Sequence, residues 1–81
     1  TLRGTIMAAE TLARIGTVDT ATQRKRAETL AVRATSEALG NTPAVARASY
    51  IDPAVFSAYE RRRLLSLDLS PESAIQRLLL G

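Results

Sequence analysis

Apolar residues recur at helical spacing in the opening segment of the chain. One face of that helix would carry Leu2, Ile6, Ala9 and Ala13. Gly16 follows directly, and glycine is the residue that most often ends a helix. The pattern therefore predicts a helix over residues 2–15.

The sequence predicts a second, longer helix from features at its start, along its length and at its end. Thr20 with Gln23 three residues later has the form of a capping box. The apolar stripe behind it consists of Ala27, Leu30, Ala31, Ala34 and Ala38. The helix is expected to run to Leu39 and to stop at Gly40, with small side chains that let neighbouring helices approach closely.

Three further helices are predicted from a polar residue followed by proline, a common helix start. Thr42-Pro43 opens a short helix that ends at Tyr50. Asp52-Pro53 opens another, expected to reach about Leu65. Ser70-Pro71 opens the terminal helix, whose inward residues are Ile75, Leu78 and Leu79.

No segment alternates polar and β-branched residues with the period of a strand. The expected fold is all-α, a compact bundle of about five helices. Its core is thin, because 14 of the 81 residues are alanine and only three are aromatic. A chain of this length buries only about 60% of its unfolded surface. We expect a larger domain to cover some of the apolar surface that remains.

Residue types that are missing exclude several kinds of chemistry. The chain has no cysteine and no histidine, so disulfides, thiol catalysis, zinc sites and Ser-His triads are excluded within it. We expect no cofactor, and no metal site built on thiolate or imidazole ligands. No apolar run reaches the roughly 20 residues of a membrane span, and no signal peptide opens the sequence. The chain is expected to be a soluble cytoplasmic protein.

The charge balance is modestly basic. Eleven Lys and Arg against eight Asp and Glu give a net charge of +3, and ten of the eleven are arginine. The surplus lies in residues 1–50, which hold seven basic and four acidic side chains, while residues 51–81 hold four of each. Arginine suits bidentate phosphate contacts. A polyanion partner is compatible with this surplus, but a solvated helix face is the better explanation of the charge taken alone.

Tyr50 is the most interesting candidate nucleophile among the side chains that remain. It ends the predicted short helix just before an Asp-Pro turn, so its hydroxyl is able to face a cleft. Arg47 lies three residues earlier on the same helical face, where it would pair with a phosphate or polarise the phenol. The alternative is that Tyr50 is a partly buried anchor with its hydroxyl at the surface.

The run from Leu39 to Pro53 (LGNTPAVARASYIDP) closely resembles the active-site region of bacterial, poxvirus-like type IB DNA topoisomerases. The opening TLRGTIMAAE resembles the family segment that begins at the threonine of its Phe-Arg-Thr motif. Residues 21–34 resemble its Arg/Lys-rich helix, and residues 69–81 resemble its C-terminal end. The resemblance implies that residues 1–81 are the C-terminal part of that catalytic domain.

Residue by residue, the resemblance makes Tyr50 the nucleophile. Asn41, nine residues earlier, matches an Asn of the bacterial group whose expected role is a hydrogen bond to the scissile phosphate; its alternative role is a simple turn residue. The family also uses two arginines and a lysine. These would lie upstream of Thr1, so this part alone is expected to be inactive. Arg3 and Lys25 do not match those positions.

The implied activity is relaxation of supercoiled DNA through a transient 3′-phosphotyrosyl link, strand rotation and religation, without ATP or metal. The implied partners are double-stranded DNA and the upstream remainder of the domain, in a nucleoid-associated monomer with no membrane contact. The candidate contacts to the DNA backbone are Arg3, Arg24, Lys25, Arg26, Arg33 and Arg47.

Three other classes of protein remain open. A tyrosine recombinase shares the chemistry and the nine-residue spacing, but usually has Leu-Gly-His where this chain has Leu-Gly-Asn-Thr-Pro. A small basic helical bundle would hold DNA without cutting it. A structural helical domain that does not bind DNA is supported by composition alone.

Overall fold

The computed structural model describes residues 2–80, which form helices joined by short loops. The helices are α1 (Leu2–Ile15), α2 (Ala21–Leu39), α3 (Pro43–Val45), the π-helical turn η1 (Ala46–Tyr50), α4 (Ala54–Glu60) and α5 (Pro71–Leu80). No strand occurs within residues 2–80. The prediction of an all-α bundle is confirmed.

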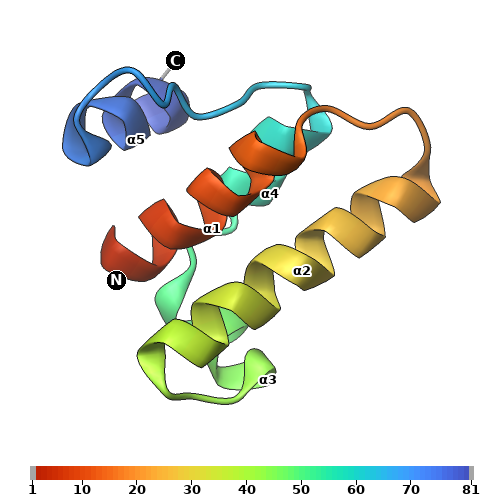
Figure 1. Cartoon of the computed structure of the whole chain (residues 1–81), viewed down its shortest axis with the longest axis vertical. Coiled ribbons are helices and arrows are strands. Elements are labelled where there is room, and N and C mark those ends of the chain that lie inside the picture. Colours follow the sequence, from red (N-terminus) through yellow and green to blue (C-terminus); the bar gives the residue numbers. More distant parts are fainter. Residues whose placement is uncertain (1, 81) are drawn as a thin grey trace.

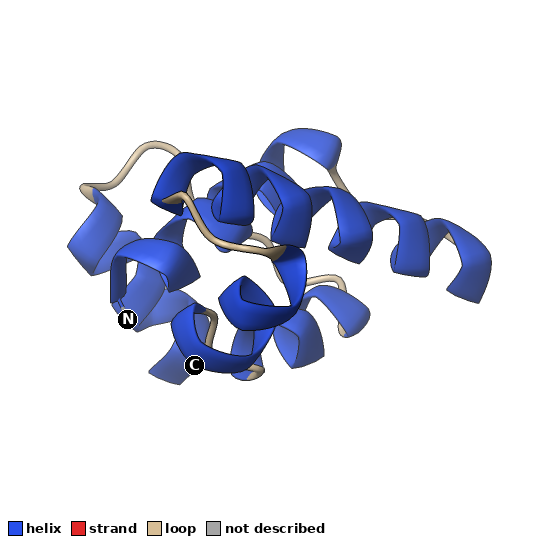
Figure 2. Ribbon diagram, turned by 90° about the horizontal axis from the view of Figure 1, so that it is seen from below, coloured by secondary structure: helices blue, strands red, loops and turns tan. Residues whose placement is uncertain are grey.

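Helix α1 lies at the centre of the arrangement. In Figure 1 it runs between α2, with which it forms an antiparallel hairpin, and α5 at the opposite edge. It also contacts η1 and α4. The molecule is flattened, with extents of 29 × 28 × 17 Å, and Figure 2 shows the helices from its thin side. Every large element thus packs against the first helix.

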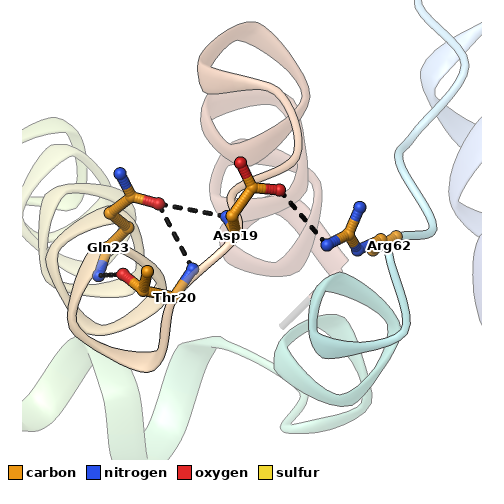
Figure 3. Close-up of polar contacts among 4 residues, drawn as sticks. All are labelled: Asp19, Thr20, Gln23 and Arg62. Atoms are coloured by element: carbon orange, nitrogen blue, oxygen red, sulfur yellow. Dashed lines mark hydrogen bonds and ion pairs between the residues drawn. The ribbon is translucent and has the colours of Figure 1, made fainter.

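The loop between α1 and α2 ends in the predicted capping box (Figure 3). Gln23 N–H donates to Thr20 Oγ1 at 3.1 Å, and Gln23 Oε1 accepts from the N–H groups of Asp19 and Thr20 at 3.0 and 3.2 Å. Asp19 also pairs with Arg62 at 3.3 Å, which joins this loop to the end of α4. The cap satisfies N–H groups that have no partner inside the helix.

Alanines form the contact between α1 and α2. Ala8, Ala9, Ala27 and Ala31 are all buried in the same core cluster. Larger side chains, among them Leu12, Val32, Ile51, Val55, Ile75 and Leu78, complete this core. Two alanines of the predicted stripe of α2, Ala27 and Ala31, are therefore buried as expected.

The predicted buried stripe of α2 was wrong in part. Leu30 is 53% exposed and Ala38 is exposed, whereas Thr35 and Ser36 are buried. These hydroxyls bond within their own helix, Thr35 Oγ1 to Ala31 O at 2.9 Å and Ser36 Oγ to Arg33 O at 2.8 Å. A hydroxyl that is satisfied in this way can be buried at little cost, so the buried face shifts toward them.

The fourth helix is shorter than predicted. It ends at Glu60 rather than near Leu65, because Arg62 adopts a left-handed conformation with φ 63°. Arg62 N–H donates to Tyr59 O and Arg63 N–H donates to Ala58 O, both at 2.9 Å. This is the Schellman pattern of helix termination, with an arginine in the position that glycine usually takes.

The terminal helix agrees with its prediction in its start and in its inward face. It begins at Pro71, it buries Ile75 and Leu78, and Leu79 packs against the core. Several large apolar side chains nevertheless remain exposed, with Leu2 at 54% and Leu80 at 79%. None of the helices within residues 2–80 is both long enough and apolar enough to cross a membrane.

Replacing Arg62 by glycine should stabilise the protein. An L-residue in the left-handed region costs about 1 kcal/mol, and Arg62→Gly removes that strain. We expect the free energy of unfolding, measured by urea denaturation, to rise by about 0.5–1 kcal/mol. Arg62→Ala is the matched control, since it also loses the Asp19 ion pair but keeps the strain. A glycine variant no more stable than the alanine variant would contradict the prediction.

Candidate functional site

Tyr50 is the last residue of η1, where the sequence placed the end of a short helix. Thr42 caps this segment through Val45 N–H, which donates to Thr42 Oγ1 at 3.3 Å, and Pro43 occupies the first helical position. After one α-helical turn the chain widens into the π-helical turn that was not predicted. Tyr50 itself is half-buried. Such turns are rare and occur often at functional sites.

The residues after Tyr50 are held firmly. Ile51 is extended and buried in the core. Asp52 N–H donates to Thr5 Oγ1 of α1 at 3.0 Å, and Asp52 Oδ1 accepts from Ala54 N–H at 2.9 Å. Asp52 therefore links α1, η1 and the start of α4.

A shallow depression lies beside the nucleophile candidate. It is lined by Leu2, Thr5, Ser49, Ile51, Asp52 and Leu79. Two of these residues, Ser49 and Ile51, are the chain neighbours of Tyr50. The depression lies between the start of α1, the end of η1 and α5.

The Arg47 side chain contacts residues of two other helices, α2 and α4. Its guanidinium lies 3.8 Å from Glu28 Oε1 of α2 and 4.7 Å from the centre of the Phe56 ring of α4. The Glu28 side chain is only 15% exposed, while that of Arg47 is 53% exposed. Arg47 thus bridges α2, η1 and α4 through an ion pair and a cation–π contact, and keeps part of its surface toward solvent.

The two tyrosines occupy contrasting environments. Tyr59 is buried, and its hydroxyl donates to Gly16 O at 2.7 Å. Burial, and secondarily the negative charge of Glu28, raise the pKa of Tyr59 above its ordinary value. Both factors oppose the phenolate that nucleophilic attack requires. Tyr59 is therefore a structural tyrosine, and Tyr50 remains the candidate nucleophile.

Asn41 lies in the exposed turn that follows α2. Gly40 has a left-handed conformation with φ 71°, and the backbone N–H groups of Gly40 and Asn41 both donate to Ser36 O. The Asn41 side-chain amide donates to Leu39 O at 3.3 Å, a long bond that leaves the amide accessible. This geometry fits a turn residue and also leaves the amide open to a phosphate.

The other basic candidates lie on two helices. Arg3 borders a depression between α1 and α5 that also contains Glu10 and Glu72, whose charges disfavour a phosphate there. On α2, Lys25, Arg26 and Arg33 are exposed and Arg24 is half-buried. Lys25 and Arg26 border a largely apolar depression on the outer face of α2, together with Thr22, Thr29 and Leu30.

Three residues at this site were not singled out from the sequence. Gly4 and Thr5 contact the segment that carries Tyr50, and Glu28 holds Arg47. One feature of the sequence could have indicated Gly4. A glycine within a helix is unfavourable, so its presence suggests that another part of the chain packs closely against the helix there. Nothing in the spacing of Thr5 or Glu28 indicated their partners, which lie 47 and 19 residues away along the chain.

No group of His, Cys, Asp or Glu side chains that could hold a metal ion occurs within the described residues. No protein-family model matches the chain, and no curated protein matches it at a significant level.

Folding stability should depend on pH through Tyr59. Because its pKa is raised in the folded state, the neutral phenol is favoured there, and this contribution to stability is fully present below pH 10.0. It is lost as pH rises through the folded pKa, when the buried hydroxyl ionises. In the Tyr50→Phe variant, where Tyr59 is the only tyrosine, tyrosinate absorbance should titrate above pH 10.0.

Two variants check the causes of that shift. Glu28→Gln in the same background should lower the midpoint by removing the nearby negative charge. Between neutral and alkaline pH, the free energy of unfolding should change less with pH in Tyr59→Phe than in Tyr50→Phe. A Tyr59 midpoint at or below 10.0 would contradict the assignment.

Proposed function

We propose that this chain is the tyrosine-bearing, C-terminal part of a type IB DNA topoisomerase catalytic domain. In this proposal Tyr50 cleaves one strand of double-stranded DNA, the duplex rotates, and the strand is resealed without ATP or a metal ion. The two arginines and the lysine of the family's active site come from the upstream part of the same domain. The protein acts as a monomer in the bacterial cytoplasm, on the nucleoid.

The run LGNTPAVARASYIDP from Leu39 to Pro53 carries the proposal. The Asn-Thr-Pro after Leu-Gly and the Asp-Pro after Tyr50-Ile favour a topoisomerase over a tyrosine recombinase, which usually has a histidine at the first of these places. The fold is compatible with this role. Tyr50 ends an ordered turn beside a surface depression, and Tyr59 is locked in the core.

The proposed chemistry is an in-line transesterification. The phenol oxygen of Tyr50 attacks the phosphorus, a P–O bond to Tyr50 forms, and the bond to the 5′ oxygen breaks. The phenol proton is lost, and the departing 5′ oxygen gains a proton to become a hydroxyl. The reverse steps reseal the strand, and one phosphodiester replaces another, so no ATP is needed.

The phosphate gains negative charge as it becomes five-coordinate. Donors fixed in advance around it stabilise that charge, and each is worth about a hundredfold or more in rate. Asn41 is proposed to supply one such donor through its side-chain amide. Arg47, Arg24, Lys25, Arg26 and Arg33 are the candidates for contacts that position the DNA backbone, with Arg3 disfavoured by its acidic neighbours.

Covalent trapping on a labelled suicide DNA substrate tests the nucleophile. The full-length protein that carries this chain should form a denaturation-resistant adduct, and Tyr50→Phe should abolish it because phenylalanine has no attacking oxygen. Tyr59→Phe is the matched control, since it removes the only other phenol in the chain and should retain the adduct. Residues 1–81 alone should form none, because the upstream donors are missing.

The outcomes separate the alternatives. An adduct that survives Tyr50→Phe, or its absence from the full-length protein, would overturn the proposal. DNA binding without an adduct would leave a helical binding module, and absence of both would leave a structural domain. Strand exchange between two DNA sites would identify a recombinase.

Asn41→Ala should slow single-turnover cleavage by about a hundredfold in the full-length protein, the usual effect of removing one phosphate donor. The free energy of unfolding should change by less than about 0.5 kcal/mol, because the side chain is exposed and its bond to Leu39 O is long. Asn41→His restores a donor, as in the poxvirus enzymes that the motif resembles, and should recover part of the rate. An alanine variant that cleaves at the normal rate would leave Asn41 a turn residue.

A further inference from the structure

The first turn of α1 makes an unusually close contact with the backbone of Tyr50. A methyl group placed on Gly4 would lie 2.9 Å from Tyr50 Cβ and 3.0 Å from its carbonyl carbon, and would overlap its carbonyl oxygen. Gly4 is buried, and glycine inside a helix is less favourable than alanine. The close approach explains why a glycine is present at this position.

The next residue of α1 holds the chain just beyond Tyr50. Thr5 is 4% exposed, and its Oγ1 accepts the Asp52 N–H at 3.0 Å. Ile51, between the two contacts, is extended and buried. Gly4 therefore permits the close approach of Tyr50 to α1, and Thr5 fixes the backbone two residues later.

We propose that Gly4 and Thr5 are positioning residues for the nucleophile. Together they fix the direction in which the Cα–Cβ bond of Tyr50 leaves the backbone, so that only the side-chain torsions remain to aim the phenol. This inference rests on the proposed function, because it gives the contact a role in phosphoryl transfer. A purely structural contact would support the fold without affecting the reaction rate.

A larger residue at position 4 must push η1 away from α1. A displacement of about 1 Å at a reacting group can cost a hundredfold in rate. The same substitution improves the helix propensity of α1, which offsets part of the lost packing. Gly4→Ala should therefore slow the reaction far more than it destabilises the protein, a combination that a merely structural role would not produce.

The test uses single-turnover cleavage of a suicide substrate by the full-length protein at saturating DNA. Gly4→Ala should lower the cleavage rate by about a hundredfold. Its affinity for DNA, measured on a non-cleavable duplex, should not change. Thr5→Val should lower the rate by about five- to tenfold, the value of one hydrogen bond, and Thr5→Ser should restore it.

Two matched controls come from the same region of the chain. Gly16→Ala adds a methyl group where no other atom lies within 4 Å but strains a backbone with φ 85°, so it shows what a loss of stability alone does to the rate. Thr11→Val removes a hydroxyl that bonds to Met7 O of its own helix. Both should cleave at the normal rate. Normal cleavage by Gly4→Ala, or equal losses in Gly4→Ala and Gly16→Ala, would overturn the inference.

A second readout does not depend on catalysis. This measurement uses residues 1–81 alone, which have no tryptophan and two tyrosines, so Tyr59→Phe leaves Tyr50 as the only tyrosine. In that background, Gly4→Ala should increase quenching of Tyr50 by iodide and Gly16→Ala should not. If the wild-type protein forms no adduct, the proposed function fails, and this measurement still decides the contact: unchanged quenching would show that Gly4 does not place Tyr50.

Discussion

The small-residue face of α1 is the constraint on which the rest of the structure depends. Gly4, Thr5, Ala8 and Ala9 are all buried, and they follow the spacing of one helical face. Alanines of α2 pack into the same core, while the backbone of η1 rests against Gly4. Larger side chains on this face would separate the elements that meet there. A chain with three aromatic residues thus obtains a packed interior through close backbone approach rather than through bulk.

This arrangement gives the two tyrosines different roles. Tyr59 fills the core and ties α4 to the loop after α1 through its bond to Gly16 O. Tyr50 lies close to Gly4 of α1 through its carbonyl group and its Cβ atom. Its side chain is therefore only half-buried although its main chain is held on both sides. The proposed nucleophile would need this combination, since it must be fixed in place and still reach a substrate.

The sequence predicted the elements well where local signals decide them. Capping and proline signals located the starts of α2, α3 and α5, because such signals act within one helical turn. The end of α4 was missed because Arg62 takes a conformation usually reserved for glycine. The buried stripe of α2 was predicted wrongly in part because the hydroxyls of Thr35 and Ser36 donate to carbonyl groups of their own helix, which allows both residues to be buried. Local sequence patterns cannot predict a contact between residues 47 positions apart. The hydrogen bond between Thr5 and Asp52 is therefore seen only in the structure.

The pair formed by Arg47 and Glu28 bears on how DNA would be held near Tyr50. Glu28 is largely buried, and the guanidinium also lies over the Phe56 ring, so both contacts restrict the Arg47 side chain before any ligand arrives. A phosphate approaching its exposed side would meet a donor whose conformational freedom is already reduced in part, which lowers the entropic cost of the contact. The neighbouring carboxylate would at the same time weaken the attraction. In the proposed complex with DNA, Arg47 would therefore help to fix the register of the duplex more than it would add to the affinity. Exposed cations such as Lys25 and Arg26 would supply more of the affinity.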